Sequence, residues 1–324
     1  MKRAIGAVFI GAAALGSTPA DAQGSSQYPS RPIRYVVASA PGGIADTSAR
    51  VLGPSLARAL GQPVVVENRT AGGLLVGAEL VAKAPPDGHM LLSVTPQLAI
   101  APSMHRQMPF DVRRDLAPVA LLGIIPNVLV VSARTPAHSV QELVDLARSQ
   151  PGKLNYSSTG QGTSVHLTAE LLKYRAGLSI VHVPYRGAAA AMNSLIAGDV
   201  DMMVESMLPL LPHIRSGRVR PLAVATAQRV PQLPEVPTLI ESGFAGFEMS
   251  GWTALMTTGG TPAAVLARLE DETRKALESA EAGATLERAG VTLRFMGARE
   301  FAAFLDGEIE KFAIAVRHSG ASIE

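Results

Sequence analysis

Residues 33–60 form the stretch IRYVVASAPGGIADTSARVLGPSLARAL, which sets the pattern of the whole chain. Its first seven residues, 33–39, are an apolar, β-branched run typical of a buried strand. Pro41-Gly42-Gly43 then ends the strand. After this turn, apolar residues return at the spacing of one helix face, at Ala49, Leu52, Leu56 and Leu60. A strand that enters a helix through a glycine turn is the repeating unit of α/β proteins.

The same alternation continues along the chain. Further strands are expected at 63–67, 90–94, 128–132, 154–157, 180–183, 200–204, 222–225 and 249–256. Further helices are expected to about Ala84, over 140–149 and 164–174, to Ala197, and over 263–280 and 299–317. This rhythm predicts mostly parallel sheets covered by helices on both faces. Ligands of such folds bind at the carboxyl ends of the strands.

Composition narrows the class of protein. A length of 324 residues favours two domains. Hydrophobic residues make up 47% and charged residues 17%, which excludes a disordered chain. Lys and Arg number 29 against 27 Asp and Glu, and a net charge of +2 argues against a nucleic-acid partner. The chain has no cysteine, which excludes disulfides, thiolate metal sites and cysteine nucleophiles.

Residues 1–22 have the pattern of a secretory signal peptide. Lys2 and Arg3 form its charged start, and residues 4–15 form an apolar run too short to span a bilayer. Ala20-Asp21-Ala22 fits the small-residue cleavage site. The alternative is an N-terminal helix of the folded protein. We expect export as a soluble protein to the periplasm, without a lipid anchor because there is no cysteine to carry one.

Two loops have the composition of anion sites made by backbone amides. The first is Pro41-Gly42-Gly43, with Asp46 in the following helix turn as a candidate cap. The second is SSTGQGTS, residues 157–164, which supplies hydroxyls, two glycines and a helix start. Glycine lets the backbone approach a ligand, and a helix N-terminus presents N–H groups and a positive dipole end. The alternatives are a tight turn for the first loop and a solvent-exposed loop for the second. Arg186-Gly187-Ala188 is a weaker candidate for the same kind of anion site.

The motifs of common enzyme classes are missing from the sequence. It contains no P-loop, no HExxH and no GxSxG, and no GxGxxG follows the first strand. His166 has two interpretations, ligand contact or packing, whereas His182 is expected in the core. Glu205 follows a strand and is expected to face the cleft, but a lone carboxylate cannot perform paired acid–base chemistry. We therefore predict no catalytic residues, no metal site and no cofactor.

A set of short motifs follows in order along almost the whole chain after residue 27. They are Tyr28-Pro29, Pro41-Gly42-Gly43-x-x-Asp46-x-x-x-Arg50, Val65-Val66-Glu67-Asn68-Arg69, Pro86-Asp87-Gly88, Tyr156-Ser157-Ser158-Thr159-Gly160-x-Gly162-Thr163-x-x-His166-Leu167, His182-Val183-Pro184-Tyr185-x-Gly187, Gly198-x-Val200-Asp201, Leu233-Pro234-x-Val236-Pro237-Thr238-x-x-Glu241-x-Gly243 and Gly260-Thr261-Pro262. This ordered set resembles the Bug-type extracytoplasmic solute-binding receptors of tripartite tricarboxylate transporters.

The resemblance implies a type II periplasmic binding fold, with two α/β domains and a ligand cleft between them. It places residues 23–124 and 239–324 in the first domain and the inserted residues 125–238 in the second. The implied ligand is a small organic acid, around which the domains close about a hinge. The implied partners are the membrane permease subunits of a tripartite transporter, and the receptor is expected to be a monomer.

The resemblance also implies which residues hold the ligand. It implies that the ligand's carboxylate is bound by two sets of residues. They are Gly42, Gly43 and Asp46 of the first loop, and Thr159, Gly162, Thr163 and His166 of the second. Glu205 stands where the family often has an acidic residue near the ligand. With Ser39, Gly187 and Ala188, these are the candidate ligand-binding residues. Ser39 replaces an aromatic residue common in the family, so we expect a ligand that is bulkier, or more polar at its distal end, than a minimal dicarboxylate.

Two other functions stay open at this point. The first is a carboxylate receptor that feeds a signalling partner instead of a permease, which uses the same kind of site. The second is a hydrolase or lyase on an α/β scaffold. The lack of a recognisable nucleophile–base pair in the sequence argues against this enzyme.

Overall fold

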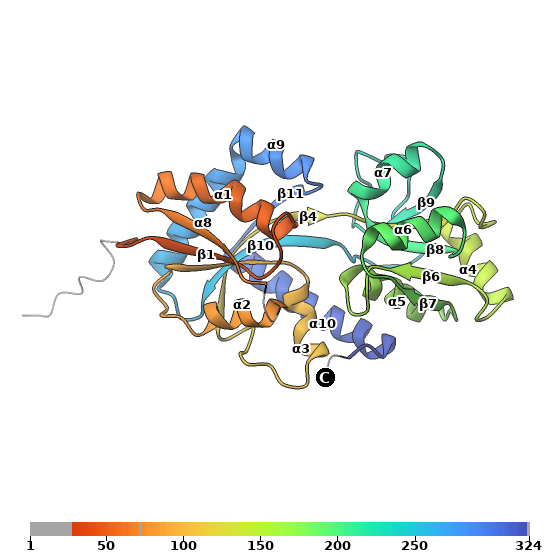
Figure 1. The fold of residues 1–324 in the computed structure, drawn as a ribbon, viewed down its shortest axis with the longest axis horizontal. Helices are drawn as coiled ribbons and strands as arrows, with labels where there is room; N and C mark the ends of the chain where they lie inside the picture. Colours follow the sequence, from red (N-terminus) through yellow and green to blue (C-terminus); the bar gives the residue numbers. More distant parts are fainter. Residues whose placement is uncertain (1–27, 71–72, 323–324) are drawn as a thin grey trace, which may run out of the picture.

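The computed structural model describes residues 28–70 and 73–322, so the predicted signal peptide at 1–22 lies outside the described residues. Two β-sheets, of six and five strands, occupy opposite ends of the long axis of the molecule (Figure 1). Helices cover both faces of each sheet. The chain therefore has the two-part α/β architecture that its sequence predicts.

The six-stranded sheet takes its strands from both ends of the described chain. Its order is β11 (Thr292–Gly297), β4 (Leu116–Ile125), β10 (Gly251–Thr258), β3 (Met90–Val94), β1 (Ile33–Val37) and β2 (Val64–Asn68). One face is covered by α1 (Ile44–Leu60), α8 (Ala263–Glu278) and α9 (Ala280–Arg288). The other face is covered by α2 (Gly73–Ala82), α3 (Gln97–Met104) and α10 (Ala298–Ser319).

The five-stranded sheet is built from one continuous stretch of chain. Its order is β7 (Val181–Pro184), β6 (Asn155–Ser158), β8 (Met202–Ser206), β5 (Asn127–Ser132) and β9 (Val219–Val224). Its helices are α4 (Val140–Ser149), α5 (Ser164–Ala176), α6 (Ala188–Ala197) and α7 (Met207–Arg215). Among the described residues, no helix combines the length and the hydropathy that a membrane crossing needs.

Both sheets are mixed, which corrects the expectation of mostly parallel sheets. In the first sheet β1 lies parallel to β2 and β3, but β10 runs antiparallel to β3 and β4. In the second sheet β6 lies parallel to β7 and β8, but β5 runs antiparallel to β8 and β9. The reason is connectivity: the chain leaves the first sheet along β4 and returns along β10, so these two strands must run in opposite directions.

The sequence analysis overlooked two strands, β4 and β11. In β4 the run LAPVALLGII contains a proline, which is uncommon inside a strand. Pro118 is tolerated because it pairs with Met256 next to an irregularity in the β10 register. β11 lies at the sheet edge and is only partly buried, so its apolar signal is weak.

Helix α10 connects the two parts of the molecule. It packs on α3 beside the first sheet and on α5 beside the second, and one apolar cluster runs through both parts (Figure 1). Inside this cluster the fully buried Trp252 donates its Nε1–H to Glu308 of α10 at 2.9 Å. Lys311, one turn later, pairs with Glu308 and donates to the carbonyl of Glu248 at 2.6 Å. These polar bonds tie α10 to the start of β10.

Two glycine-to-alanine substitutions should change stability in opposite directions. A Cβ at Gly259, directly after β10, would lie 2.2 Å from the Arg114 carbonyl oxygen and 2.8 Å from the Asp115 carbonyl carbon. Both atoms belong to the backbone leading into β4, so Gly259→Ala should lower the unfolding free energy by about 1–3 kcal/mol. Gly307 is exposed on α10, and a Cβ added there would have nothing within 4 Å, so Gly307→Ala should raise stability by about 0.5–1 kcal/mol. Urea unfolding of both variants tests this, and shifts of the same sign would contradict it.

Candidate functional site

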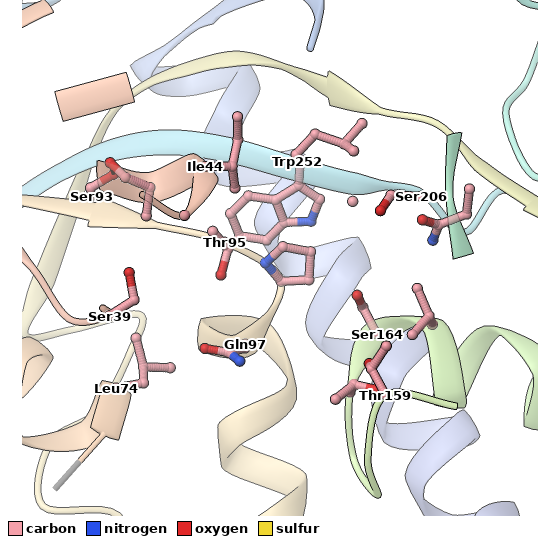
Figure 2. A pocket seen from close by; sticks show the side chains of 18 of the residues that line it. Ser39, Ile44, Leu74, Ser93, Thr95, Gln97, Thr159, Ser164, Ser206 and Trp252 are labelled. Carbon is pink, nitrogen blue, oxygen red and sulfur yellow. Dashed lines mark hydrogen bonds between the residues drawn. The ribbon is translucent and has the colours of Figure 1, made fainter. Parts of the chain in front are cut away.

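A cleft opens between the two sheets. Its first part, the polar cavity, has a volume of about 350 Å³ and contains Ser39, Ser93, Thr95, Asn127, Thr159 and Glu205 in its wall. The adjoining cavity, of about 560 Å³, is called the apolar cavity after Leu74, Leu75, Ile100, Ala101 and Met104 in its wall, which also contains Gly162, Thr70, His105 and Gln161. Ser39, Gln97 and Thr163 line both cavities, so the two are parts of one cleft. Figure 2 shows Ser39 and Gln97 in the wall of the polar cavity.

Four helices begin at the polar cavity. Gly43 and Thr163, the N-caps of α1 and α5, line it, as do Gln97 at the start of α3 and Ser206, the N-cap of α7. These helices follow β1, β6, β3 and β8, whose carboxyl ends meet here, as α/β topology requires. The first N–H groups of a helix have no partner within it, and they carry the positive end of the helix dipole. Helix-start amides that have no partner in the protein are therefore candidate donors to an anion in the polar cavity, which no described Lys, Arg or His side chain lines.

The first loop is fixed from behind by Asp46. Its carboxylate accepts hydrogen bonds from the Gly42 amide at 2.9 Å, from Asn68 Nδ2 at 2.9 Å and from Arg50 Nε at 3.0 Å. Burial alone would raise the pKa of Asp46, but the bonds from Arg50, Gly42 and Asn68 together hold it below its usual value. Gly42 has a φ of +86°, which only glycine adopts readily. Asp46 and Gly42 thus shape the loop while Gly43 lines the cavity.

The second loop is fixed in a similar way by the first turn of α5. Thr163 Oγ1 caps the helix by accepting from the His166 amide at 3.3 Å, and it donates to the Gly160 carbonyl at 2.9 Å. The Gly162 amide donates to His166 Nδ1 at 3.2 Å. Thr159 lines the polar cavity (Figure 2), and Gly162 lines the apolar one.

His166 belongs to a buried cluster behind this loop. Its ring lies 4.2 Å from that of His182, and Ser158 Oγ lies 2.7 Å from His182 Nε2. Burial, together with the neighbouring His182, lowers the pKa of His166 to about 4. His166 is therefore neutral at pH 7, so its Nδ1 can accept a hydrogen bond from the Gly162 amide.

Two residues that line the polar cavity each have a buried polar atom without a hydrogen-bond partner among the described residues. Glu205 is 5% exposed, and its Oε1 accepts from the amide and the hydroxyl of Ser206, both at 2.8 Å. Its Oε2 has no partner among the described residues, and the same holds for Ser39 Oγ. Burial raises the pKa of Glu205, although the bonds from Ser206 oppose this shift. Unpartnered buried polar atoms are costly, so both point to groups that a ligand satisfies.

The cleft brings together six of the residues that the sequence singled out. Ser39, Gly43, Thr159, Thr163 and Glu205 line the polar cavity, and Gly162 lines the apolar one. Asp46 and His166 lie behind the loops, and Gly42, in the first loop, lines neither cavity. Gly187 and Ala188, at the start of α6, line neither cavity. The roles of all these residues as ligand contacts stay predictions.

Sequence reasoning missed other residues of the cavity wall. Ser93, Thr95 and Gln97 end β3 and begin α3, and the rule that ligands bind at strand carboxyl ends would have identified them. Asn127 and Trp252 lie at the beginning of antiparallel strands that start at the cleft. The rule about carboxyl ends therefore does not apply to them. In residues 28–70 and 73–322, no group of three His, Asp or Glu side chains is arranged to hold a metal ion.

Comparison with known proteins gives a consistent result. A family model described as tripartite tricarboxylate transporter family receptor matches residues 48–320. The protein BugT of Bordetella pertussis is 34% identical, over 98% of this chain and 97% of its own length. The periplasmic binding protein BugD is 29% identical with a TM-score of 0.71, covering 92% of this chain and all of BugD. A protein of R. palustris solved with adipate is 30% identical with a TM-score of 0.74, covering 91% and 99%.

Removal of the Asp46 carboxylate should destabilise the protein in a pH-dependent manner. Asp46→Ala leaves the Gly42 amide and Asn68 without their acceptor, and we expect a loss of about 1–3 kcal/mol in unfolding free energy at pH 7. Because the pKa of Asp46 is lowered in the folded state, its contribution is complete above about pH 5 and is lost as the pH falls through that lowered pKa. Urea unfolding at several pH values measures the difference from wild type.

The matched control is Asp145→Ala, since Asp145 is exposed on α4 and bonds only Gln141 in its own helix. It should change stability by less than about 0.5 kcal/mol. A difference between Asp46→Ala and wild type that stayed constant down to pH 2 would contradict the assigned role.

Proposed function

The chain belongs to the tripartite tricarboxylate transporter receptor family, and from this premise we propose that it is a periplasmic solute-binding protein that captures a small organic carboxylate in its cleft. The observation that carries the proposal is the meeting of four helix N-termini at one cavity whose described lining contains no Lys, Arg or His. Such N-termini bind anions through backbone N–H groups. Hydrogen bonds to a charged group are worth about 1.5–3 kcal/mol each, so a few of them suffice for a carboxylate.

The two cavities define the shape of the ligand. We infer that its carboxylate occupies the polar cavity and that an aliphatic or aromatic part extends into the apolar cavity. Leu74, Ile100 and Met104 offer hydrophobic contact there, and Ser39 stands at the junction. Adipate, present in one solved relative, has this combination of a carboxylate and a methylene chain.

Release of the ligand requires a partner and a movement. We propose that membrane permease subunits of a tripartite transporter receive the ligand. We also propose that residues 23–124 together with 239–324 form one domain, that 125–238 form the other, and that they close about their two connections. Helix α10 packs on both parts of the molecule. Closure of the domains therefore either keeps this packing or moves α10 along one of its neighbours.

A binding role suits the cleft better than catalysis. Ser158 and His182 lie within hydrogen-bond distance, the arrangement of a nucleophile and its base. Ser158, however, is 1% exposed and lines neither cavity, so a ligand in the cleft does not reach it. We therefore propose that the protein is not an enzyme.

A panel of acids tests the proposed ligand class. Mono- and dicarboxylates of three to eight carbons, with benzoate as an aromatic member, should include acids that raise the melting temperature. Ligand at 100 times its Kd adds about 2.7 kcal/mol to the stability of the native state. Neutral diamides of the same lengths are the matched controls and should leave the melting temperature unchanged. Equal shifts of the melting temperature with acids and diamides would contradict the assignment of an anion site.

Ser39 should set the size of the ligand. Ser39→Phe places a ring at the junction of the two cavities and should weaken the longer acids at least about tenfold while sparing short ones such as malonate, because only the longer acids cross the junction. Ser39→Ala removes the hydroxyl without adding bulk, and it should keep the ranking by length. Isothermal titration calorimetry on both variants gives the affinities. If Ser39→Phe left the ranking of acids unchanged, Ser39 would not border the ligand.

A further inference from the structure

Among the described residues that line the polar cavity, one side chain is ionisable and none is a cation. Glu205, next to the last residue of β8, lines the cavity and is 5% exposed, and its buried Oε2 has no partner in the described part of the chain. Oε1 is occupied by the two donors of Ser206. A carboxylate ligand held by the helix N-termini around this cavity therefore meets the free oxygen of a second carboxyl group.

In the part of the chain that the structure describes, the elements packed around Glu205 bring no other charge into the polar cavity. β5 places Val128 opposite Glu205, with Asn127 beside it, and α5 contributes Ser164 and Val165 to the wall. The titratable residues of the neighbouring elements are engaged elsewhere: Asp46 of α1 with Arg50, and Glu170 of α5 with Lys173 and Tyr156. His166 and His182 contact each other behind the second loop, with their rings tilted by 36°. Among the described residues of the cleft, the other titratable side chain is His105, in the wall of the apolar cavity.

Two carboxylates in one cavity without a cation cannot both remain ionised at low cost, because like charges and burial each favour the neutral form. We propose that Glu205 binds the ligand's carboxylate in its protonated form, so that capture of a ligand takes up a proton from solvent wherever Glu205 of the free protein is ionised. The proton is on Oε2, since Oε1 already accepts two hydrogen bonds. Glu205 then donates an O–H···O⁻ bond, which is shorter and stronger than a neutral one. This inference rests on the proposed function.

The direction of the pH dependence follows from the position of Glu205. Burial already raises its pKa in the free protein, with opposition from the Ser206 bonds, and a bound anion raises it further. Below the free-state pKa, Glu205 is protonated with or without ligand. Between the free and the bound pKa, binding requires a proton, and affinity falls by a factor of about ten per pH unit as the pH rises. Binding of the carboxylate is thus favoured by mild acidity.

Calorimetry with adipate as the probe tests the inference. Titrations from pH 6.5 to 8.5, above the ionisation range of adipate itself, in buffers of different ionisation enthalpy count the protons taken up. Wild type should take up protons on binding adipate, at most one per adipate, and lose affinity with rising pH. Glu205→Gln keeps the size and replaces the O–H donor by an amide N–H, so its affinity should be independent of pH and exceed that of wild type at pH 8.5. His105→Gln, whatever its affinity, should keep the wild-type pH dependence.

Other outcomes overturn the inference. Adipate binding without proton uptake, or with an uptake that Glu205→Gln leaves intact, would show that Glu205 does not carry the proton. If neither adipate nor benzoate binds at any pH, the proposed ligand class fails instead. The inference is then decided by the carboxyl carbon-13 titration of glutamate-labelled protein, with Glu205 assigned from the signal missing in Glu205→Gln. A Glu205 titration at or below the ordinary glutamate value would overturn it, and one above that value would support it.

Discussion

The pairing of β10 with β4 is the interaction on which the rest of the structure depends. These strands pair antiparallel from Gly251 opposite Ile125 to Thr258 opposite Leu116. β4 continues through one residue, Pro126, into β5 of the second sheet, and β10 begins where the chain returns from that sheet. The pairing therefore keeps the two connections between the sheets side by side. It also places Ile125, Gly251 and Trp252 in the wall of the polar cavity.

This arrangement explains how a cavity whose described wall holds no cationic side chain can attract an anion. The parallel strands of both sheets point their carboxyl ends toward the connections, so the helices that follow them begin at one place. Their dipoles and free amides concentrate partial positive charge there. The loops need fixed shapes to orient these amides. The ionised Asp46 fixes the first loop by accepting a hydrogen bond from the Gly42 amide, and the neutral His166 fixes the second by accepting one from the Gly162 amide. The surroundings of each side chain keep it in the charge state in which it can accept a hydrogen bond from a backbone amide of its loop.

The local pattern of the chain predicted much of this. Strand-to-glycine-to-helix units identified β1 with α1 and β6 with α5, and with them Gly43, Thr159 and Thr163 in the cavity wall. Glu205 was identified because it ends an apolar strand. The roles of Asp46 and His166 as supports of the loops were not, because a sequence shows that a polar side chain lies near a loop but not toward which side it turns.

What the sequence determined by itself is most of the units of strand, turn and helix, because periodicity, glycine and capping residues act over a few neighbouring positions. What only the tertiary structure decided is how these units meet. The antiparallel direction of β10, the register irregularity that accommodates Pro118 and the arrival of Asn127 and Trp252 at the cleft all depend on partners far away in the chain. The unpartnered Oε2 of Glu205 has the same origin, since its burial and the lack of a cation among the described residues around it are properties of the assembled cavity and not of any segment.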